Sequence, residues 1–474
     1  MSDGSVLVLD VGKTNAKATL WTRAGDLIAS RQHANATSSV GAKGRLDVAG
    51  VGALLAASLT EMAKLGPIDM IVPVAHGAAA AFLCDGALAA APVCYESAPA
   101  PDVAAAYNAM RDPFAATGSP RLPDGLNLGV QLYELEEGAP ELKRPNVEIV
   151  PYAQYWSWRL CGVAASEVSA LGCHTDLWRP YDRRFSDLAR QRGWDRRFAP
   201  LRRAADVLGV VRNEWVARTG VNADCRVLCG GHDSNVAFYG VRSNPELAGR
   251  DVTVISTGTW FVAMRAPMPG FQLNSGDLNP DRDVLINVTV EGEPAPSARF
   301  MGGREVERLI GGEDNPLRDP DFVHDVVPQS VAAVLNKGAM ILPSFAPGVG
   351  PFAARRGGWE GPELSGVERR AAVGLYLALM TEAALALIGA RDAIVVEGRF
   401  AADTTFLRAL AALRPDCEIY AAEADDGLSS GALRLARPEF QSRRALSKIA
   451  PLRHALGAYA ERWRRFAAET GAAA

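Results

Sequence analysis

The sequence predicts an α/β protein built from two similar halves. Predicted strands and helices alternate along most of its 474 residues, as is typical of α/β domains. Residues 6–21 and 252–264, far apart in the chain, share one design of a strand, a glycine turn and a second strand. The chain is also long enough for two domains that each have a hydrophobic core of their own.

The first of these hairpins lies close to residue 1. Val6–Leu9 has the composition of a buried strand, and Asp10 ends it with a carboxylate that needs a cation or a donor. Gly12 permits a sharp turn. The turn then offers ammonium, hydroxyl and amide groups, from Lys13, Thr14, Asn15 and Lys17. That mixture suits a phosphate tail that carries a divalent metal, but an ordinary hairpin with a charged edge explains it equally well.

The elements that follow continue the first half. We expect strands over 16–21 and 27–32, a helix over 51–65 with its leucines on one face, and a strand over 69–75. That last strand ends at His76 and Gly77.

A turn with paired glycines closes the first half. In Gly230-Gly231-His232-Asp233 the glycines let the backbone approach a ligand, and Asp233 places one carboxylate at the turn. Residues 234–238 have the composition of a helix start, so a role for Asp233 as an N-cap is the structural alternative. The polar segment 242–249 is the expected boundary, giving domains 1–244 and 245–474.

The second half repeats the plan. Its hairpin turn holds Thr257, Gly258 and Thr259 between strands over 252–256 and 260–265. Further strands are expected over 285–290, 339–342 and 393–396, with a buried helix over 371–388 and a basic amphipathic helix over 455–466. The strand over 393–396 leads into a third turn, at Gly398 and Arg399.

These motifs carry a resemblance to a known family. The turns at 10–14, 230–233 and 256–260 occur in the order found in FGGY carbohydrate kinases, and the resemblance covers nearly the whole chain. Residues 155–162, followed by Ser166, Ser169 and Thr175, resemble the segment before that family's catalytic turn. The Thr-Gly-Thr-Trp sequence is similar to the rhamnulokinase and fuculokinase side of the family. The resemblance implies a two-domain actin-like (ribonuclease H-like) fold with the active site in the interdomain cleft.

The resemblance also implies an activity and the residues that perform it. The implied reaction is ATP-dependent phosphorylation of a ketose such as L-fuculose or L-rhamnulose, with Asp233 in the N-terminal domain as catalytic base. Asp10 would hold Mg²⁺ through bound water, while His76, Gly77 and Asp233 would contact the sugar. Contacts to the nucleotide, mainly from the C-terminal domain, fall to Gly12, Lys13, Thr14, Asn15, Thr257, Gly258, Thr259, Gly398, Arg399, Gly431 and Ala432.

The sequence departs from the family at two of these positions. Lys13 stands where the family usually has a small or hydroxyl residue, so it either helps to hold phosphate or pairs with a surface carboxylate. Glu397 and Arg399 flank Gly398 where many members have successive glycines, which leaves the nucleotide preference open. His76 is equally well explained as a buried histidine bonded to backbone.

Composition excludes several other classes of protein. With 48% hydrophobic and 22% charged residues and a net charge of −4, the chain does not resemble a nucleic-acid-binding or membrane protein. The start lacks the positive end of a signal peptide, and seven scattered cysteines favour a reducing, cytoplasmic location. A homodimer is left open. The alternatives to a ketose kinase are a polyol kinase and a non-catalytic nucleotide-binding protein of the same fold.

Overall fold

The computed structural model describes residues 4–36, 38–40, 43–268, 271, 279–310, 327–422 and 427–468. The chain forms two compact units. The first unit contains residues 1–245, 286–294 and 426–442, and the second contains residues 246–285, 295–425 and 443–474. The first change of unit therefore lies at Pro245, but two later segments return to the first unit, which a single boundary in the sequence does not describe.

The first unit is built on a mixed sheet with the order β12-β13-β6-β1-β2-β3, to which β14 is added beside β6. β1 pairs with β2 antiparallel and with β6 parallel. The predicted strands are confirmed. The strands are β1 (Ser5–Val11), β2 (Asn15–Trp21), β3 (Leu27–Ala34), β6 (Ile68–Ala75), β12 (Val207–Val210), β13 (Arg226–Leu228) and β14 (Gly231–His232).

The apolar run in β1 is explained by burial on both faces of the sheet. Leu7, Leu9 and Val11 join one core cluster, and the alternating Val6 and Val8 join another. Because side chains of a strand alternate between faces, each face must be covered by helices, and no position of the run can be polar. These helices are α1 (Val48–Met62), α5 (Tyr152–Cys161) and α8 (Asn213–Thr219) on one face and α9 (Asp233–Arg242) and α15 (Gly427–Ala436) on the other.

The helix α1 begins three residues before the predicted start. Asp47 is its N-cap, and its side chain accepts a hydrogen bond from the N–H of Gly50. A carboxylate in this position satisfies one of the free N–H groups of the first turn, which fixes where the helix begins. The apolar face expected from the leucines is confirmed, with Leu54, Leu55 and Leu59 buried.

A smaller three-stranded sheet, β8-β7-β9, extends the first unit and has a core of its own. Its elements and neighbours are β4 (Ser38–Val40), β5 (Lys43–Arg45), β7 (Ala80–Cys84), β8 (Ala87–Ala90), β9 (Val147–Pro151), β10 (Trp178–Arg179), β11 (Arg184–Phe185), α2 (Pro101–Met110), α3 (Phe114–Thr117), α4 (Leu128–Gly138), α6 (Val168–Leu171) and α7 (Asp187–Gln191).

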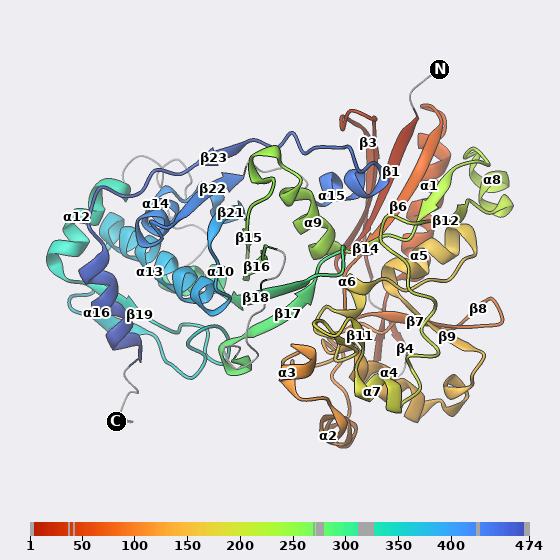
Figure 1. Cartoon of the computed structure of the whole chain (residues 1–474), viewed down its shortest axis with the longest axis horizontal. Helices are drawn as coiled ribbons and strands as arrows, with labels where there is room; N and C mark the ends of the chain where they lie inside the picture. Colours follow the sequence, from red (N-terminus) through yellow and green to blue (C-terminus); the bar gives the residue numbers. More distant parts are fainter. Residues whose placement is uncertain are drawn as a thin grey trace. The chain divides into compact units, whose positions relative to one another are not determined.

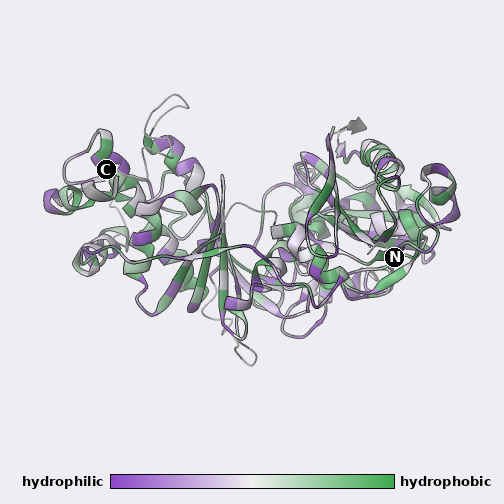
Figure 2. Ribbon diagram, turned by 90° about the horizontal axis from the view of Figure 1, so that it is seen from above, coloured by the Kyte–Doolittle hydropathy of each residue, from purple (hydrophilic) through white to green (hydrophobic). Residues whose placement is uncertain are grey.

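A second sheet, built mainly from residues of the second unit, repeats the plan of the first. Its order is β17-β18-β16-β15-β21-β22-β23, with an antiparallel hairpin β15–β16 and β21 parallel to β15 (Figure 1). Figure 2 shows strands of both sheets coloured as hydrophobic. The strands are β15 (Val252–Thr257), β16 (Phe261–Ala266), β17 (Val284–Val288), β18 (Pro294–Phe300), β19 (Met340–Leu342), β20 (Gly358–Glu360), β21 (Asp392–Gly398), β22 (Cys417–Ala422) and β23 (Leu446–Lys448).

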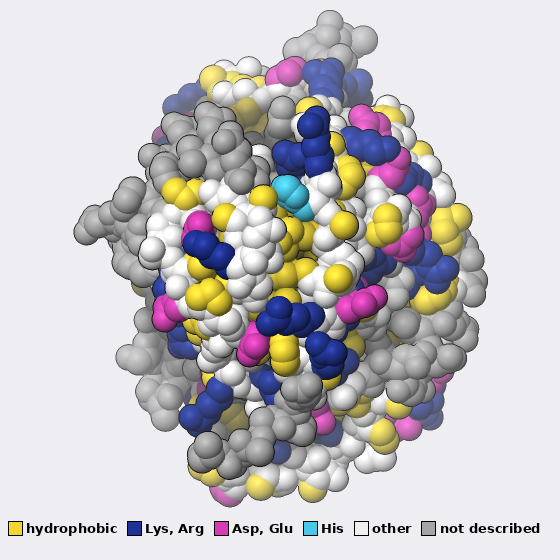
Figure 3. All heavy atoms as spheres, turned by 90° about the vertical axis from the view of Figure 1, so that its left-hand side faces the viewer, with side chains coloured by type: hydrophobic (Ala, Val, Ile, Leu, Met, Phe, Trp, Pro, Cys, Tyr) yellow, Lys and Arg dark blue, Asp and Glu magenta, His cyan; other side chains and the backbone are white. Residues whose placement is uncertain are grey.

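The helices of the second unit include one long apolar helix. They are α10 (Gly302–Ile310), α12 (Val327–Lys337), α13 (Gly366–Leu387), α14 (Thr404–Leu413) and α16 (Gly457–Ala468). By length and composition α13 is long and apolar enough to cross a membrane. However, 78% of its most apolar 18-residue segment is buried inside the protein, which confirms the predicted core helix. On the face drawn in Figure 3, basic and acidic side chains lie interspersed.

Candidate active site

Three parallel strands of the first unit bring Gly12, His76 and Asp233 to the same edge of the sheet. The register places Val11 and His232 beside Ala75 of β6, and Asp10 and Gly231 beside Val74. The next residue of each strand is therefore Gly12, His76 or Asp233, at the carboxyl ends of β1, β6 and β14. Ligands of open α/β sheets bind at this end of the strands.

The turn after β1 is braced by a residue that the sequence reasoning missed. Asn35, just after β3, donates from its Nδ2 to the carbonyl of Gly12 at 2.8 Å and from its N–H to the carbonyl of Thr14 at 2.8 Å. Thr14 and Asn15 are exposed at this turn. Asn35 follows β3, a strand that is not part of this hairpin turn, so no local pattern in the sequence connects it with the turn.

Lys13 pairs with Glu96, a second residue outside the predicted set. The hydrogen bond that Lys13 donates to Glu96 raises the pKa of Lys13, so the lysine is positively charged at neutral pH. Glu96 is 59% exposed, and an ion pair of this kind contributes at most about 1 kcal/mol. Both interpretations of Lys13 therefore stay open, since a weak surface pair can give way to a phosphate.

His76 is buried against two tyrosine rings. Its ring centroid lies 5.4 Å from that of Tyr95, edge to face, and 5.1 Å from that of Tyr152. Nδ1 bonds to the carbonyl of Gly77 at 2.8 Å, whereas Nε2 has no hydrogen-bond partner among the described residues. Burial lowers the pKa of His76, which keeps the ring neutral. A buried nitrogen without a partner fits a ligand hydroxyl.

Asp233 is the first residue of α9, and His232 takes the N-cap position. Its side chain is 25% exposed. Its Oδ1 accepts from the N–H of Ser234 at 2.5 Å and from the hydroxyl of the same residue at 3.1 Å. The expected alternative of an N-cap is not what the structure shows, although a negative charge in the first turn still interacts favourably with the helix dipole.

The segment 228–230, which leads into Asp233, is held by buried polar side chains. Gln154 donates from Nε2 to the carbonyls of Cys229 and Gly230 at 3.1 and 3.0 Å. Ser157 donates to the carbonyls of Leu228 and Cys229. Gly230 has φ +70°, and a Cβ there would lie 1.8 Å from the carbonyl oxygen of Pro73, so only glycine fits. The turn thus presents Asp233 from a rigid support.

The turn predicted in the second unit is equally well packed. Gly258 donates its N–H to the carbonyl of Trp260 at 3.0 Å, and Thr259 is exposed. A Cβ on Gly303, at the start of α10, would lie 2.1 Å from the carbonyl oxygen of Gly258. The turn and the helix N-terminus therefore lie in contact, and both carry backbone N–H groups of the kind that bind phosphate.

The third predicted turn lies beside the second. The register pairs Thr257 with Gly398, and the hydroxyl of Thr257 donates to the carbonyl of Glu397 at 2.6 Å. Gly398 and Arg399 are exposed. Glu397 accepts from Ser256 at 2.6 Å and pairs with Arg444 at 2.7 Å, so its charge is neutralised inside the second unit.

Gly431 and Ala432 lie inside a helix contact of the first unit. A Cβ on Gly431 would lie 1.9 Å from the carbonyl oxygen of Val236 in α9, and Ala432 is fully buried. Figure 1 shows α15 beside α9. Close packing of the two helices accounts for both small residues without a ligand.

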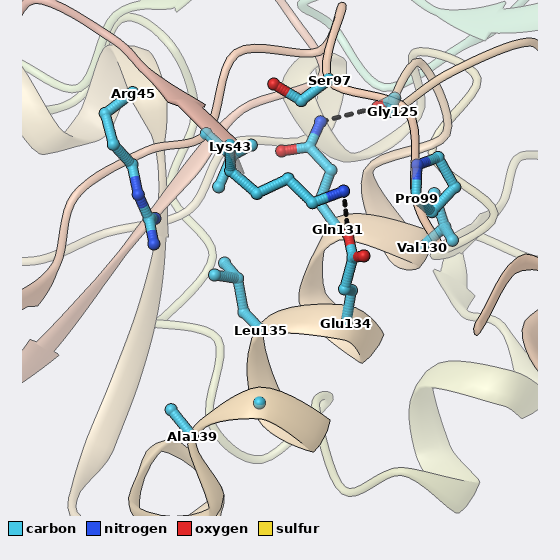
Figure 4. Close-up of a pocket in the computed structure, with 12 residues that line it drawn as sticks. Lys43, Arg45, Ser97, Pro99, Gly125, Val130, Gln131, Glu134, Leu135 and Ala139 are labelled. Carbon is cyan, nitrogen blue, oxygen red and sulfur yellow. Dashed lines mark hydrogen bonds and ion pairs between the residues drawn. The ribbon is translucent and has the colours of Figure 1, made fainter. Parts of the chain in front are cut away.

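A cavity of about 260 Å³ lies between β5, α4 and residues 93–99 of the first unit. Lys43, which pairs with Glu134 at 2.8 Å, and Arg45 extend over it, and Leu135 and Ala139 form an apolar side (Figure 4). Val93, Ser97 and Pro99 line it, and they belong to the same segment as Tyr95, which contacts His76, and Glu96, which pairs with Lys13.

The chemistry of the first turn fits a metal delivered with a nucleotide. Among the described residues, no group of three or more His, Cys, Asp or Glu side chains has the arrangement of a metal site. Asp10 is one carboxylate at the end of β1. Mg²⁺ commonly binds through one or two carboxylates together with substrate phosphates and water, so Asp10 suffices for that mode.

Comparison with known proteins shows which family this chain resembles. The model of the FGGY carbohydrate kinase C-terminal domain matches residues 249–444. A carbohydrate kinase from Novosphingobium aromaticivorans is similar at 43% identity and a TM-score of 0.94, covering 98% of this chain and 99% of that chain. Xylulose kinase from Rhodospirillum rubrum shares the fold at 18% identity and a TM-score of 0.75, covering 98% of each chain. A search of curated proteins gave no match.

The high identity over nearly the whole of both chains establishes more than a shared fold. The duplicated sheet is that of the two-domain actin-like proteins, as the resemblance implied. The chain belongs to the FGGY carbohydrate kinase family, whose members use ATP to phosphorylate small sugars.

Proposed function

We propose that this protein transfers the γ-phosphoryl group of ATP to a hydroxyl of a ketose, with L-fuculose, L-rhamnulose or a closely related sugar as substrate. The observation that carries the proposal is the common edge formed by Gly12, His76 and Asp233 at the ends of three parallel strands. One edge then offers a phosphate turn, a neutral imidazole and a carboxylate. The choice of L-fuculose or L-rhamnulose rests on the resemblance of the Thr257–Trp260 turn to the rhamnulokinase and fuculokinase side of the family.

In the proposed reaction Asp233 accepts the proton of the sugar hydroxyl. The hydroxyl oxygen forms a bond to the γ-phosphorus as the bond from that phosphorus to the bridging oxygen of ADP breaks. His76 Nε2, buried and without a partner among the described residues, binds a second sugar hydroxyl beside Gly77. Mg²⁺, held through Asp10, would offset the negative charge of the phosphates.

The nucleotide contacts are divided between the two units in this proposal. Residues 12–15 of the first unit and 257–259 of the second unit bind the phosphates through backbone N–H and hydroxyl groups. Gly398 and Arg399 lie on the adenosine side. Gly431 and Ala432 are assigned an indirect role, since packing against α9 already accounts for them.

A sugar-dependent ADP-release assay tests the proposal. The purified protein is supplied with ATP, Mg²⁺ and a panel of ketoses, aldoses and polyols. We expect the highest kcat/KM with a ketose. A maximum with glycerol or another polyol would instead make the protein a polyol kinase.

The role of Asp233 is tested by Asp233→Asn, which keeps the size of the side chain and removes its basicity. We expect turnover to fall by about 10²- to 10⁴-fold while ATP affinity, measured by calorimetry, stays within a factor of two. Near-normal turnover would show that the catalytic base lies elsewhere.

A cytoplasmic location completes the proposal, and a homodimer is left open. The seven cysteines are all free, which supports a reducing compartment. Sedimentation equilibrium measures the oligomeric state directly.

A further inference from the structure

His232, the residue before Asp233, is buried and is held from several directions. Its backbone N–H donates to the hydroxyl of Ser169 at 3.2 Å. Its Nδ1 lies 2.6 Å from Oδ1 of Asn235, and its Nε2 lies 3.2 Å from Oδ1 of Asp233. A Cβ on Gly77 would come within 2.8 Å of Nε2, so the glycine after His76 makes room for the ring.

The contacts of Asn235 determine which ring nitrogen of His232 carries a proton. The amide nitrogen of Asn235 donates to the carbonyl of Val288, which leaves its Oδ1 facing the histidine. Since an amide oxygen only accepts, Nδ1 of His232 must be the donor. Nε2 then faces Sγ of Cys173, its hydrogen-bond partner, and Oδ1 of Asp233, which lies at ion-pair distance. It attracts the Asp233 carboxylate only when it also carries a proton.

The groups around His232 favour that doubly protonated, positive form. Burial by itself lowers the pKa of His232, but the charges of Cys173 and Asp233 outweigh burial and raise the pKa to about 10. Sγ of Cys173 lies 3.6 Å from Nε2. Burial raises the pKa of Cys173, but His174 and His232 outweigh it and lower the pKa to about 5.

The contacts to Asp233 are one-sided. The N–H of Ser234, the hydroxyl of Ser234 and Nε2 of His232 all contact Oδ1. Within the described part of the chain no hydrogen bond or ion pair reaches Oδ2 of Asp233. One oxygen of the carboxylate is therefore anchored, and the other is available to a substrate.

We propose that His232 is a positioning residue for phosphoryl transfer, holding Oδ1 of Asp233 so that Oδ2 alone receives the proton of the sugar hydroxyl. This inference rests on the proposed role of Asp233 as the base. His232 itself does not touch the sugar. It acts by fixing the rotamer of the base, and a displacement of about 1 Å in a reacting group costs on the order of 10²-fold in rate.

The charge of His232 adds a pH dependence. The titratable groups that face it are Asp233 in α9, Cys173 after α6, Glu167 at the start of α6 and His76 at the end of β6. At alkaline pH Nε2 of His232 would lose its proton. A lone pair on Nε2 would then face a lone pair on Oδ1 of Asp233. We expect kcat to decline there, because Oδ1 of Asp233 is then no longer held.

The test is His232→Gln with His33→Gln as its matched control. His33 also contacts a carboxylate, with Nε2 3.0 Å from Oδ2 of Asp47, but it lies outside the proposed site. We expect His232→Gln to lower kcat by about 10- to 100-fold with KM for sugar and Kd for ATP within threefold, and to lose the alkaline limb of the pH profile. His33→Gln should leave all three values and the pH profile unchanged.

A double-mutant cycle with Asp233→Asn separates this inference from the proposed function. If His232 acts only through Asp233, adding His232→Gln to Asp233→Asn should change kcat less than threefold. A kcat of His232→Gln near the wild-type value, or a full additional loss in the double variant, would overturn the inference. Near-normal turnover of Asp233→Asn alone would instead overturn the assignment of the base.

Folding of the variant is checked independently. Circular dichroism and ATP calorimetry of His232→Gln should match the wild type. If that variant does not fold, Asn235→Ala provides the second test, because it removes the acceptor that orients the ring. A smaller loss of kcat with unchanged KM is expected there, and unchanged kcat would count against the inference. The alkaline limb of the wild-type enzyme is measured without any substitution.

Discussion

Lys13 is the residue whose role depends most on its partner. Its ion pair with Glu96 occupies the ammonium that a nucleotide phosphate would otherwise attract. Lys13→Ala should therefore weaken ATP binding by about 3- to 10-fold and make it less sensitive to salt, because one phosphate contact is lost. Calorimetry at low and at moderate ionic strength measures both effects.

The partner substitution Glu96→Gln should change ATP affinity in the opposite direction, since it releases Lys13. Equal ATP affinities in wild type, Lys13→Ala and Glu96→Gln would identify the lysine as a surface charge.

Glu167 makes stability depend on pH. It is fully buried, its Oε2 accepts from Ser169, and burial raises its pKa to about 7 although the bonds from Ser169 act against this. Because the folded state binds this proton more tightly than the unfolded state, the contribution of Glu167 to stability falls as pH rises from about 4.5 to about 7. Glu167→Gln should remove that fall, since an amide stays neutral.

Urea midpoints measured between pH 5 and pH 8 for wild type and Glu167→Gln check this expectation. Glu214→Gln, at an exposed position of α8, is the control and should follow the wild type. Parallel curves for wild type and Glu167→Gln would mean that Glu167 is ionised in the folded protein at all these pH values.

At the scale of elements, the contact between α9 and α15 explains why residues 426–442 belong to the first unit. Gly240 and Gly431 face each other at this crossing, where a Cβ on Gly240 would lie 2.5 Å from the backbone nitrogen of Gly431. Gly431→Ala should destabilise the protein by about 1–3 kcal/mol because neither backbone can withdraw. Gly457→Ala, at the open start of α16, should be neutral or slightly stabilising.

The same pair of variants separates packing from ligand contact. If Gly431 serves packing, the chemical denaturation midpoint falls while ATP affinity of the folded protein is unchanged. A normal midpoint with weakened ATP binding would restore the direct nucleotide contact expected from the sequence.

At the scale of the whole molecule, the proposed nucleotide contacts come from both units. Residues 12–15 belong to the first unit and residues 257–259 to the second. In the proposed complex both turns contact the same phosphates, and closing a site around its substrates excludes water as a competing acceptor. We expect sugar and nucleotide together to reduce the radius of gyration, as measured by small-angle X-ray scattering.

The sugar-free and nucleotide-free samples are the controls for this measurement. An identical radius of gyration in all states would contradict ligand-driven closure.

The sequence by itself determined the strands, the hairpin turns and the family of this protein. Those features are local: the apolar run Val6–Leu9, the glycine turns and the spacing of leucines in α1 report burial and backbone conformation directly. The order of the turns along the chain then sufficed for the family.

Only the tertiary structure decided which distant side chains complete the candidate site. Asn35 reaches the Gly12 turn from β3, Glu96 reaches Lys13 from a loop, and Cys173 reaches His232 from the end of α6. It also placed Gly431 at the crossing of α9 and α15. It made His232, rather than Asp233, the N-cap of α9. Contacts between segments far apart in sequence leave no periodic pattern, because they depend on how the strands of the sheet are ordered.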